Sequence, residues 1–219
     1  MRVPTLAFST DSDQDTVASR LLAINTRTPT DTTEQWLRTE PEKCAALLKQ
    51  YDFLRWEFMP SPSLDDVWLS TYAYHEAEGR WPEQIAIDIA SDIGHDTGDE
   101  WSSLRDRMPQ PRALAREREA HVLLLHHASD SERTKRPCPR KGDMQGKVSA
   151  LPEVIITCGL TGNGDLHVAC VKNRHAKADA DANNHFPMHL DAATSFVGDY
   201  VPNVPQHSYA GWGGEEGWG

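Results

Sequence analysis

The chain has 219 residues, of which 38% are hydrophobic and 25% charged, and its formal net charge is −11. An acidic surface repels phosphate backbones, so broad nucleic-acid binding is disfavoured. No run of about 18 apolar residues occurs, which argues against a membrane-spanning helix.

Residues 1–30 are rich in Ser, Thr and Asp, with only one short apolar patch, from Val17 to Ile24. This composition predicts a polar, partly disordered lead. The segment lacks the basic and then apolar order of a signal peptide. We therefore expect a protein of the cytoplasm, the nucleus or both, whose four cysteines stay reduced.

Residues 31–129 predict a helical domain. Thr39 followed by Pro41 is typical of a helix start, and the apolar spacing predicts one helix that continues to Phe58. A second start is expected at Ser63, where the sequence has a capping-box pattern, and Gly79 is expected to end that helix.

The segment Pro82–Ile93 is ambiguous. Three isoleucines alternate within it as in a strand, but Pro82 before them and Gly94 after them suit a helix, which we favour. Two further helices are expected, a short one over Trp101 to Met108 and a longer one over Ala113 to Ala128.

Residues 130–150 have the composition of a linker, with six basic and three acidic residues and two prolines. The basic residues include Lys135, Arg136, Arg140 and Lys141. Clustered cations on a proline-stiffened segment suit an importin groove or a phosphate surface, which predicts a nuclear-import role. The alternative is a solvated linker that uses its charge to stay soluble.

Residues 151–205 predict a small β-containing unit. Val154–Leu160 and Leu166–Val171 are β-rich runs, and the turn between them contains Asn163-Gly164, a strong hairpin signal. Residues 206–219 are expected to form a flexible tail rich in Gly and Trp. The expected fold class is therefore α+β: a helix-rich N-terminal domain, a basic linker and a small hairpin-containing C-terminal unit.

The hairpin raises the question of a metal site. With a two-residue loop Cys158 faces Ala169, and with a three-residue loop it faces Cys170, which would allow a disulfide or half of a zinc site. His185 and His189 follow with a metal-like His-x3-His spacing. The alternative is two strand cysteines in a small core and scattered histidines. No cofactor is expected apart from this candidate zinc ion.

The tail carries two tryptophans, Trp212 and Trp218, each between glycines, with Glu215 and Glu216 between them. A tryptophan on a flexible glycine strand can insert its ring into a pocket of a partner, and the glutamates favour a basic pocket rim. The arrangement resembles the Gly-Trp hooks by which some silencing proteins and some viral suppressors of RNA silencing bind Argonaute. The alternative is an unstructured acidic end.

The segment from Ser91 to Glu100 resembles the His-Asp-Ile-Gly-His segment of helical HD-type metal phosphohydrolases. The resemblance implies metal-activated water, with Asp92 in the doublet, His75 upstream and Asp130 downstream. Ser91 stands where that family has a metal-binding histidine, although His95-Asp96 offers a doublet in a shifted register. The alternative is a helix stop followed by a polar loop.

No P-loop, dinucleotide fingerprint or Gly-x-Ser-x-Gly occurs in the sequence. The sequence therefore predicts a non-catalytic interaction or regulatory protein that binds a protein partner through its tail, in the sharpest version an Argonaute-binding viral suppressor of RNA silencing. A metal-dependent hydrolase with an HD-like segment and a structural or assembly subunit stay open as alternatives, and the helical domain is compatible with a homo-oligomer.

Overall fold

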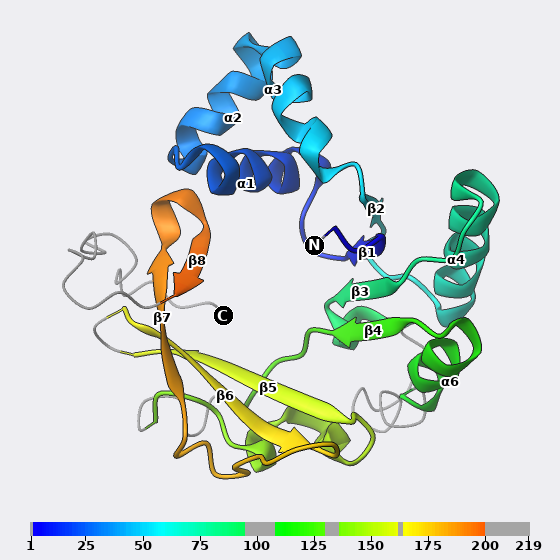
Figure 1. Ribbon diagram of the computed structural model, residues 1–219, viewed down its shortest axis with the longest axis vertical. Helices are drawn as coiled ribbons and strands as arrows, with labels where there is room; N and C mark the ends of the chain where they lie inside the picture. The colour runs from blue at the N-terminus through cyan, green and yellow to red at the C-terminus, as the bar shows by residue number, and fades with distance from the viewer. Residues whose placement is uncertain (1, 95–107, 130–135, 162–163, 200–219) are drawn as a thin grey trace.

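The computed structural model describes residues 2–94, 108–129, 136–161 and 164–199, and it contains two four-stranded sheets (Figure 1). The first, here called the parallel sheet, has the strand order β2-β1-β3-β4. The second, the antiparallel sheet, has the order β5-β6-β7-β8. The expected α+β division into a helical domain and a hairpin unit is therefore wrong.

The elements follow one another along the chain in two groups. The strands are β1 (Thr5–Ser9), β2 (Leu54–Phe58), β3 (Gln84–Asp88), β4 (His121–Leu124), β5 (Val154–Leu160), β6 (Leu166–Asn173), β7 (Phe186–Asp191) and β8 (Phe196–Asp199). The helices are α1 (Gln14–Thr26), α2 (Thr30–Thr39), α3 (Pro41–Leu48), α4 (Leu64–Glu78) and α6 (Pro109–Arg118). Short 3-10 turns are η1 (Lys49–Tyr51), η2 (Ala90–Asp92), η4 (Lys141–Asp143), η5 (Gln145–Ala150) and η6 (Ala192–Thr194).

The expected polar lead contains a strand of the core. All five residues of β1 are buried, and the strand pairs with β2 on one side and with β3 on the other. The polar residues after it form the start of α1, where the Asp13 side chain accepts a hydrogen bond from the Thr16 backbone N–H. The strand is only five residues long, which is too short for hydrophobic periodicity to separate it from its polar surroundings.

Three segments that were expected to be helical are strands of the parallel sheet. The helix that starts at Pro41 ends at Leu48, and β2 follows it. Pro82–Ile93 contains β3, and the second half of Ala113–Ala128 contains β4. Each of these strands is only four or five residues long, and a short apolar run does not by itself distinguish a strand from a helix.

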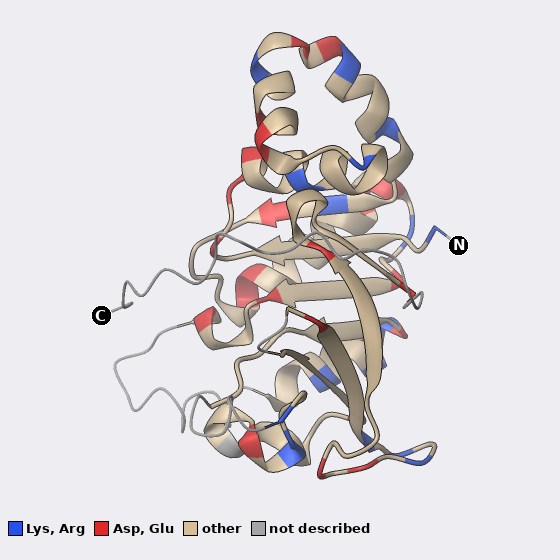
Figure 2. Ribbon diagram, turned by 90° about the vertical axis from the view of Figure 1, so that its left-hand side faces the viewer, with Lys and Arg blue, Asp and Glu red and all other residues tan. Residues whose placement is uncertain are grey.

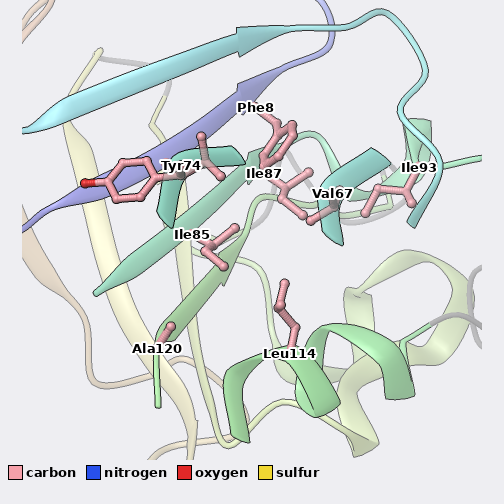
Figure 3. Close-up of a cluster of buried hydrophobic side chains, with 9 residues drawn as sticks. Phe8, Val67, Tyr74, Ile85, Ile87, Ile93, Leu114 and Ala120 are labelled. Atoms are coloured by element: carbon pink, nitrogen blue, oxygen red, sulfur yellow. The ribbon is translucent and has the colours of Figure 1, made fainter. Parts of the chain in front are cut away.

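Helix α4 follows the sequence prediction closely. Ser63 and Asp66 form the expected capping box, and Gly79 ends the helix in the left-handed conformation. One face of the parallel sheet packs against α4 and α6 through Phe8, Ile85, Ile87, Val67 and Leu114, which belong to one buried cluster (Figure 3).

The expected hairpin is present, but in neither anticipated register. β5 pairs with β6 so that Leu160 lies opposite Leu166, and Thr161 donates a backbone hydrogen bond to Asp165 across the turn. Cys158 consequently lies opposite Val168. The connection is longer than the two or three residues that hairpin preferences suggested.

The segment between the two sheets is packed against them. Cys138 belongs to a buried cluster with Ile155, Ala169 and Val171 of the antiparallel sheet. Val148 is buried near Leu124 of β4. Where it is described, this segment is therefore not the solvated linker that its composition suggested. None of the described helices has both the length and the apolar composition that a membrane crossing requires.

Candidate functional site

The carboxyl ends of the parallel strands form the best candidate site. In a parallel sheet these ends meet at one edge, which is where ligands of open α/β sheets bind. β1 ends at Ser9 and is followed by Thr10 and Asp11, while β3 ends at Asp88. Figure 2 shows acidic residues, in red, at the end of the sheet where the strands finish.

Thr10 connects the two central strands at this edge. Its backbone N–H donates to the Asp88 carbonyl at 2.8 Å, and its hydroxyl donates to Asp92 Oδ2 at 2.6 Å. The same hydroxyl accepts the Ile89 backbone N–H at 3.0 Å. The turns that follow β1 and β3 are thus held together by one side chain, which fixes the position of their carboxylates.

The loop after β1 is also held from within. The Ser9 hydroxyl donates to the Ser12 carbonyl at 2.9 Å and accepts the Ser12 N–H at 3.3 Å. Asp11 projects from this loop and is exposed. A rigid loop that presents one exposed carboxylate beside a second strand end is suited to binding a cation.

The electrostatics of Asp88 support this interpretation. Burial raises the pKa of the Asp88 carboxyl, the charges of Asp11 and Asp92 raise it further, and the opposing charges of Arg20 and His127 lower it. A carboxylate among other carboxylates is destabilised in its charged form, and a bound cation would relieve that repulsion.

The donor set limits which cation could bind. Among the described residues, no group of three or more His, Cys, Asp or Glu side chains is arranged to hold a metal by itself. Mg²⁺ is commonly held by one or two carboxylates together with phosphates of a substrate. Asp88 and Asp11 fit that kind of shared site and do not fit an all-protein cage.

A second charged feature lies at the end of β6. The Lys172 ammonium donates to the carbonyls of Ser149 at 2.7 Å and Ala150 at 2.8 Å, and Arg174 donates to Ala150 at 3.2 Å. Burial lowers the pKa of Lys172, and the nearby Arg174 and Lys141 lower it further. We call Lys141, Lys172 and Arg174 the basic cluster; its crowded positive charge favours an anion.

The residues considered for a metal site do not converge. Cys170 lies opposite Ile156 and Cys158 opposite Val168, so the two cysteines share one face of the hairpin but are not partners across it. All four cysteines are free. His185 Nδ1 lies 2.9 Å from Nδ1 of His167, and His189 packs near the Phe196 ring. His167 was not anticipated because the register was unknown.

The basic residues of the expected linker are partly folded against the antiparallel sheet. Arg136 donates to the Asp181 carbonyl at 3.0 Å, and Arg140 forms an ion pair with Asp143 at 3.2 Å. The Lys141 backbone N–H donates to the Ala180 carbonyl. Lys135 lies outside the described residues, as do the tail residues Trp212, Glu215, Glu216 and Trp218.

The HD-like residues lie at different ends of the sheet. His75 is in the last turn of α4, before the chain enters β3, and stacks on Trp81 at 4.1 Å. Asp92 follows the other end of β3 and accepts from Thr10. A five-residue strand separates these ends by about 13 Å, so the two side chains are not ligands of one ion. His95, Asp96 and Asp130 lie outside the described residues.

Sequence reasoning missed Thr10, Asp11 and Asp88. The available signal was an apolar run that ends in Asp, Ile85-Ala86-Ile87-Asp88, but its assignment to a helix hid it. Asp11 was missed because residues 1–30 were expected to be partly disordered.

No family model matches the chain. The chain is 29% identical over 207 residues to the Gene 65 protein of Mycobacterium phage D29, covering 90% of this chain and 86% of that protein. It is also 29% identical over 208 residues to the Gene 65 protein of Mycobacterium phage L5, covering 90% and 75% respectively.

Solved structures identify the fold. One solved ATPase domain, here called the reference ATPase domain, matches with a TM-score of 0.73 and 11% identity over 90% of this chain and 74% of that domain. A DnaB-like replicative helicase, described with its interactions with primase, matches with a TM-score of 0.72 and 11% identity over 90% of this chain and 50% of that one. A KaiC-like protein from Pyrococcus horikoshii OT3 matches with a TM-score of 0.59 and 11% identity, over 91% and 76%. The likeness shows that the chain has the same fold as these RecA-like domains.

This fold corrects the functional prediction. The interpretation as a non-catalytic, Argonaute-binding suppressor of RNA silencing with a Gly-Trp hook is wrong, because the fold matches an ATPase domain, a DnaB-like helicase and a KaiC-like protein. The HD-type alternative fails for the same reason, since its expected helical domain is replaced by a parallel sheet.

Proposed function

We propose that the chain is a helicase-like module of phage DNA replication, and that its carboxyl edge supplies the acidic part of a magnesium–nucleotide site. One observation carries the proposal. A RecA-like sheet with TM-scores of 0.73 and 0.72 to the reference ATPase domain and a DnaB-like helicase places Asp11 and Asp88 together at the edge where such sheets bind ligands.

The roles of the side chains follow from their positions. Asp88, held at the end of β3, and Asp11, exposed beside it, would hold Mg²⁺ together with phosphate oxygens. Thr10 is a positioning residue, because it fixes the turn that carries Asp92 and the backbone after Asp88. A magnesium ion bound here would neutralise charge on the nucleotide phosphates.

The phosphate-binding loop of such a site has no recognisable motif in this sequence. The printed sequence contains no G-x-x-x-x-G-K-[ST], the loop whose backbone N–H groups surround the phosphates in ATPases of this kind. The chain therefore contributes the carboxylates of the nucleotide site and not the loop that binds its phosphates.

Contact with DNA is expected to be local. The net charge of −11 opposes broad binding, whereas the basic cluster concentrates positive charge at one end of β6. We therefore expect the basic cluster to contact a few phosphates of single-stranded DNA.

The nucleotide site can be tested with Mn²⁺·ATP and the isotope-labelled full chain. The paramagnetic ion should broaden the amide signals of residues 10–12 and 88–92 first. Asp88→Asn and Asp11→Asn should each reduce this broadening several-fold. Asp52→Asn is the matched control, since Asp52 pairs with Arg2 at the opposite edge of the sheet. Broadening that is absent, or that survives Asp88→Asn, would contradict the proposed site.

The DNA contact can be tested by fluorescence anisotropy with an oligo-dT probe. A contact with about three phosphates predicts a slope of about −2 for log K against log[salt]. Lys141→Ala should weaken binding and reduce this slope, whereas Lys43→Ala, whose ammonium lies over the Trp36 ring, should not. Equal effects of the two variants would show that the basic cluster has no particular role.

A further inference from the structure

The two sheets meet at two strand edges that have no strand partner. Within the described residues, β4 is the last strand of the parallel sheet, β5 is the first of the antiparallel sheet, and neither pairs with a strand on its outer side. The edges belong to neighbouring parts of the structure, because Leu124 of β4 and Leu151 before β5 pack against the same buried cluster. Soluble proteins normally cover such edges or protect them with charge.

The free edge of β4 can be assigned residue by residue. His121 donates to the Glu83 carbonyl and Leu125 donates to the Ile87 carbonyl, so these residues face β3. Along a strand, successive backbone groups point to opposite sides. The N–H and C=O groups of Val122 and Leu124 therefore point away from β3, toward the position that an additional strand would occupy.

The surface beside these edges is apolar. Of the nine large hydrophobic residues that the described chain exposes most, five lie on β4 or β5 or directly after β4: Leu123, Leu125, Val154, Ile156 and Leu160. Leu123 is 49% exposed and Ile156 is 61% exposed. An apolar surface of this kind marks a site for another protein segment.

The strand register places these residues on the faces of the sheets that no described segment covers. In β5, Ile155 and Thr157 are buried, while Ile156 and Leu160 alternate with them and point away from that core. In β4, Val122 and Leu124 pack with the α4–α6 cluster, so Leu123 points to the opposite side. The open faces thus border the open strand edges.

The fold comparison indicates what would cover them. The chain accounts for 74% of the reference ATPase domain, so about a quarter of such a domain has no counterpart here. The printed sequence contains no P-loop motif, so the P-loop of such a domain has no counterpart among these residues. A P-loop is carried by one structural unit, a strand, the phosphate-binding loop and a helix. The strand of this unit needs two free edges, and its helix needs an apolar face to cover.

We propose that the β4 and β5 edges receive between them, in trans, the strand of a P-loop-bearing segment from another polypeptide, whose helix covers Leu123 and Ile156. The inference rests on the proposed nucleotide site. A strand inserted parallel to β4 would end at the same edge as Asp88, so its phosphate-binding loop would face the carboxylates that this chain provides. Association would be a form of strand addition, with main-chain hydrogen bonds on both sides.

Hydrogen exchange on the full chain tests the proposal, with the strand–P-loop–helix segment of the reference ATPase domain as the probe. Exchange of the Val122 and Leu124 amides should slow by about tenfold or more when the probe is added, and amides in the first half of β5 should slow with them. Leu123→Lys and Ile156→Lys, both at exposed positions, should abolish this protection. Leu69→Lys is the matched control, because Leu69 is 68% exposed on α4, away from both edges.

Each outcome either supports or overturns the proposed strand insertion. Protection that is lost in the two edge variants and kept in Leu69→Lys supports the proposal. Absence of binding, or binding without protection of Val122 and Leu124, overturns it. Edges already protected in the isolated chain overturn it too, and sedimentation velocity then shows whether a second copy or the chain itself covers them. Mn²⁺·ATP broadening near Asp88 is scored separately, so an edge that binds the probe without a nucleotide site would refute the proposed function alone.

Discussion

The parallel and the antiparallel sheet have four strands each, but their strands are buried to different extents. Every residue of β1 is buried; the strand has a strand neighbour on both sides, and α4 and α6 pack on the face that carries Leu6 and Phe8. β5 alternates between buried and exposed residues, since the described residues cover only one face of the antiparallel sheet. The comparison shows that burial of a strand depends on how many of its sides are occupied, and that the residues described by the structure leave sides of β5 unoccupied.

The largest expected effect on stability comes from replacing one phenylalanine in each sheet. Phe8→Ala removes a fully buried ring from the cluster shared with α4 and α6, and should lower the free energy of unfolding by about 3–5 kcal/mol. Phe186→Ala, at a position that is 68% exposed, should change it by less than about 0.5 kcal/mol. Urea denaturation measures both. Similar losses would mean that the antiparallel sheet is covered on both faces.

Gly159→Ala examines the covered face of the antiparallel sheet. A Cβ at this position would collide with the Pro137 carbonyl, whereas Gly142 has nothing within 4 Å. We expect Gly159→Ala to cost about 1–3 kcal/mol by overpacking, and Gly142→Ala to serve as the control. Burial raises the pKa of the neighbouring Cys138 thiol to about 11, so displacement of this segment should also speed its reaction with a thiol reagent. Unchanged stability and reactivity would contradict the close packing at Gly159.

Ser63→Ala examines α4, a helix that packs on the parallel sheet. The Ser63 hydroxyl accepts from the Asp66 N–H, and the Asp66 carboxylate accepts from Ser63. Loss of this cap should lower stability by about 1 kcal/mol. Thr39→Ala is the control, since Thr39 bonds to the Gln35 carbonyl within its own helix and caps nothing. Thermal unfolding of the two variants should differ, and an equal decrease would argue against the capping box.

Asp88→Asn should have the smallest effect on stability, and the opposite sign. Burial and the charge of Asp11 raise the pKa of Asp88 in the folded state, so the folded chain holds this proton to a higher pH than the unfolded chain does. Stability is therefore lost as pH rises from about 4, the usual pKa of Asp, through the raised value. The variant lacks this loss, so its melting temperature should exceed that of the wild type at about pH 7 by about 1–3 °C.

The same experiment separates a functional carboxylate from a structural one. A melting temperature that rises while Mn²⁺·ATP broadening falls would indicate that Asp88 is kept for binding at the expense of stability. The advantage of the variant should disappear near about pH 4, where both proteins carry a neutral group. A variant that is less stable at neutral pH would show that the ionised Asp88 is held by favourable contacts.

Signals within a few residues of one another were predictable. The capping box at Ser63, the stop at Gly79 and the two strands of the β5–β6 hairpin each depend on local backbone preferences or on alternation along one half-buried sheet. Strand β3 was missed because Ile85 and Ile87 are buried by residues far away in the sequence, and a short apolar run does not by itself distinguish a strand from a helix.

The site was even less accessible to sequence reasoning. Thr10 and Asp92 are separated by 82 residues, and Asp11 approaches Asp88 only because β1 and β3 are parallel neighbours. The sequence by itself determined the acidic balance, the caps, the turns and the hairpin, since these depend on composition and short-range contacts. The tertiary structure decided the strand order, the meeting of the carboxylates at one edge and the two edges left open, because pairing between distant segments has no signature in either segment alone.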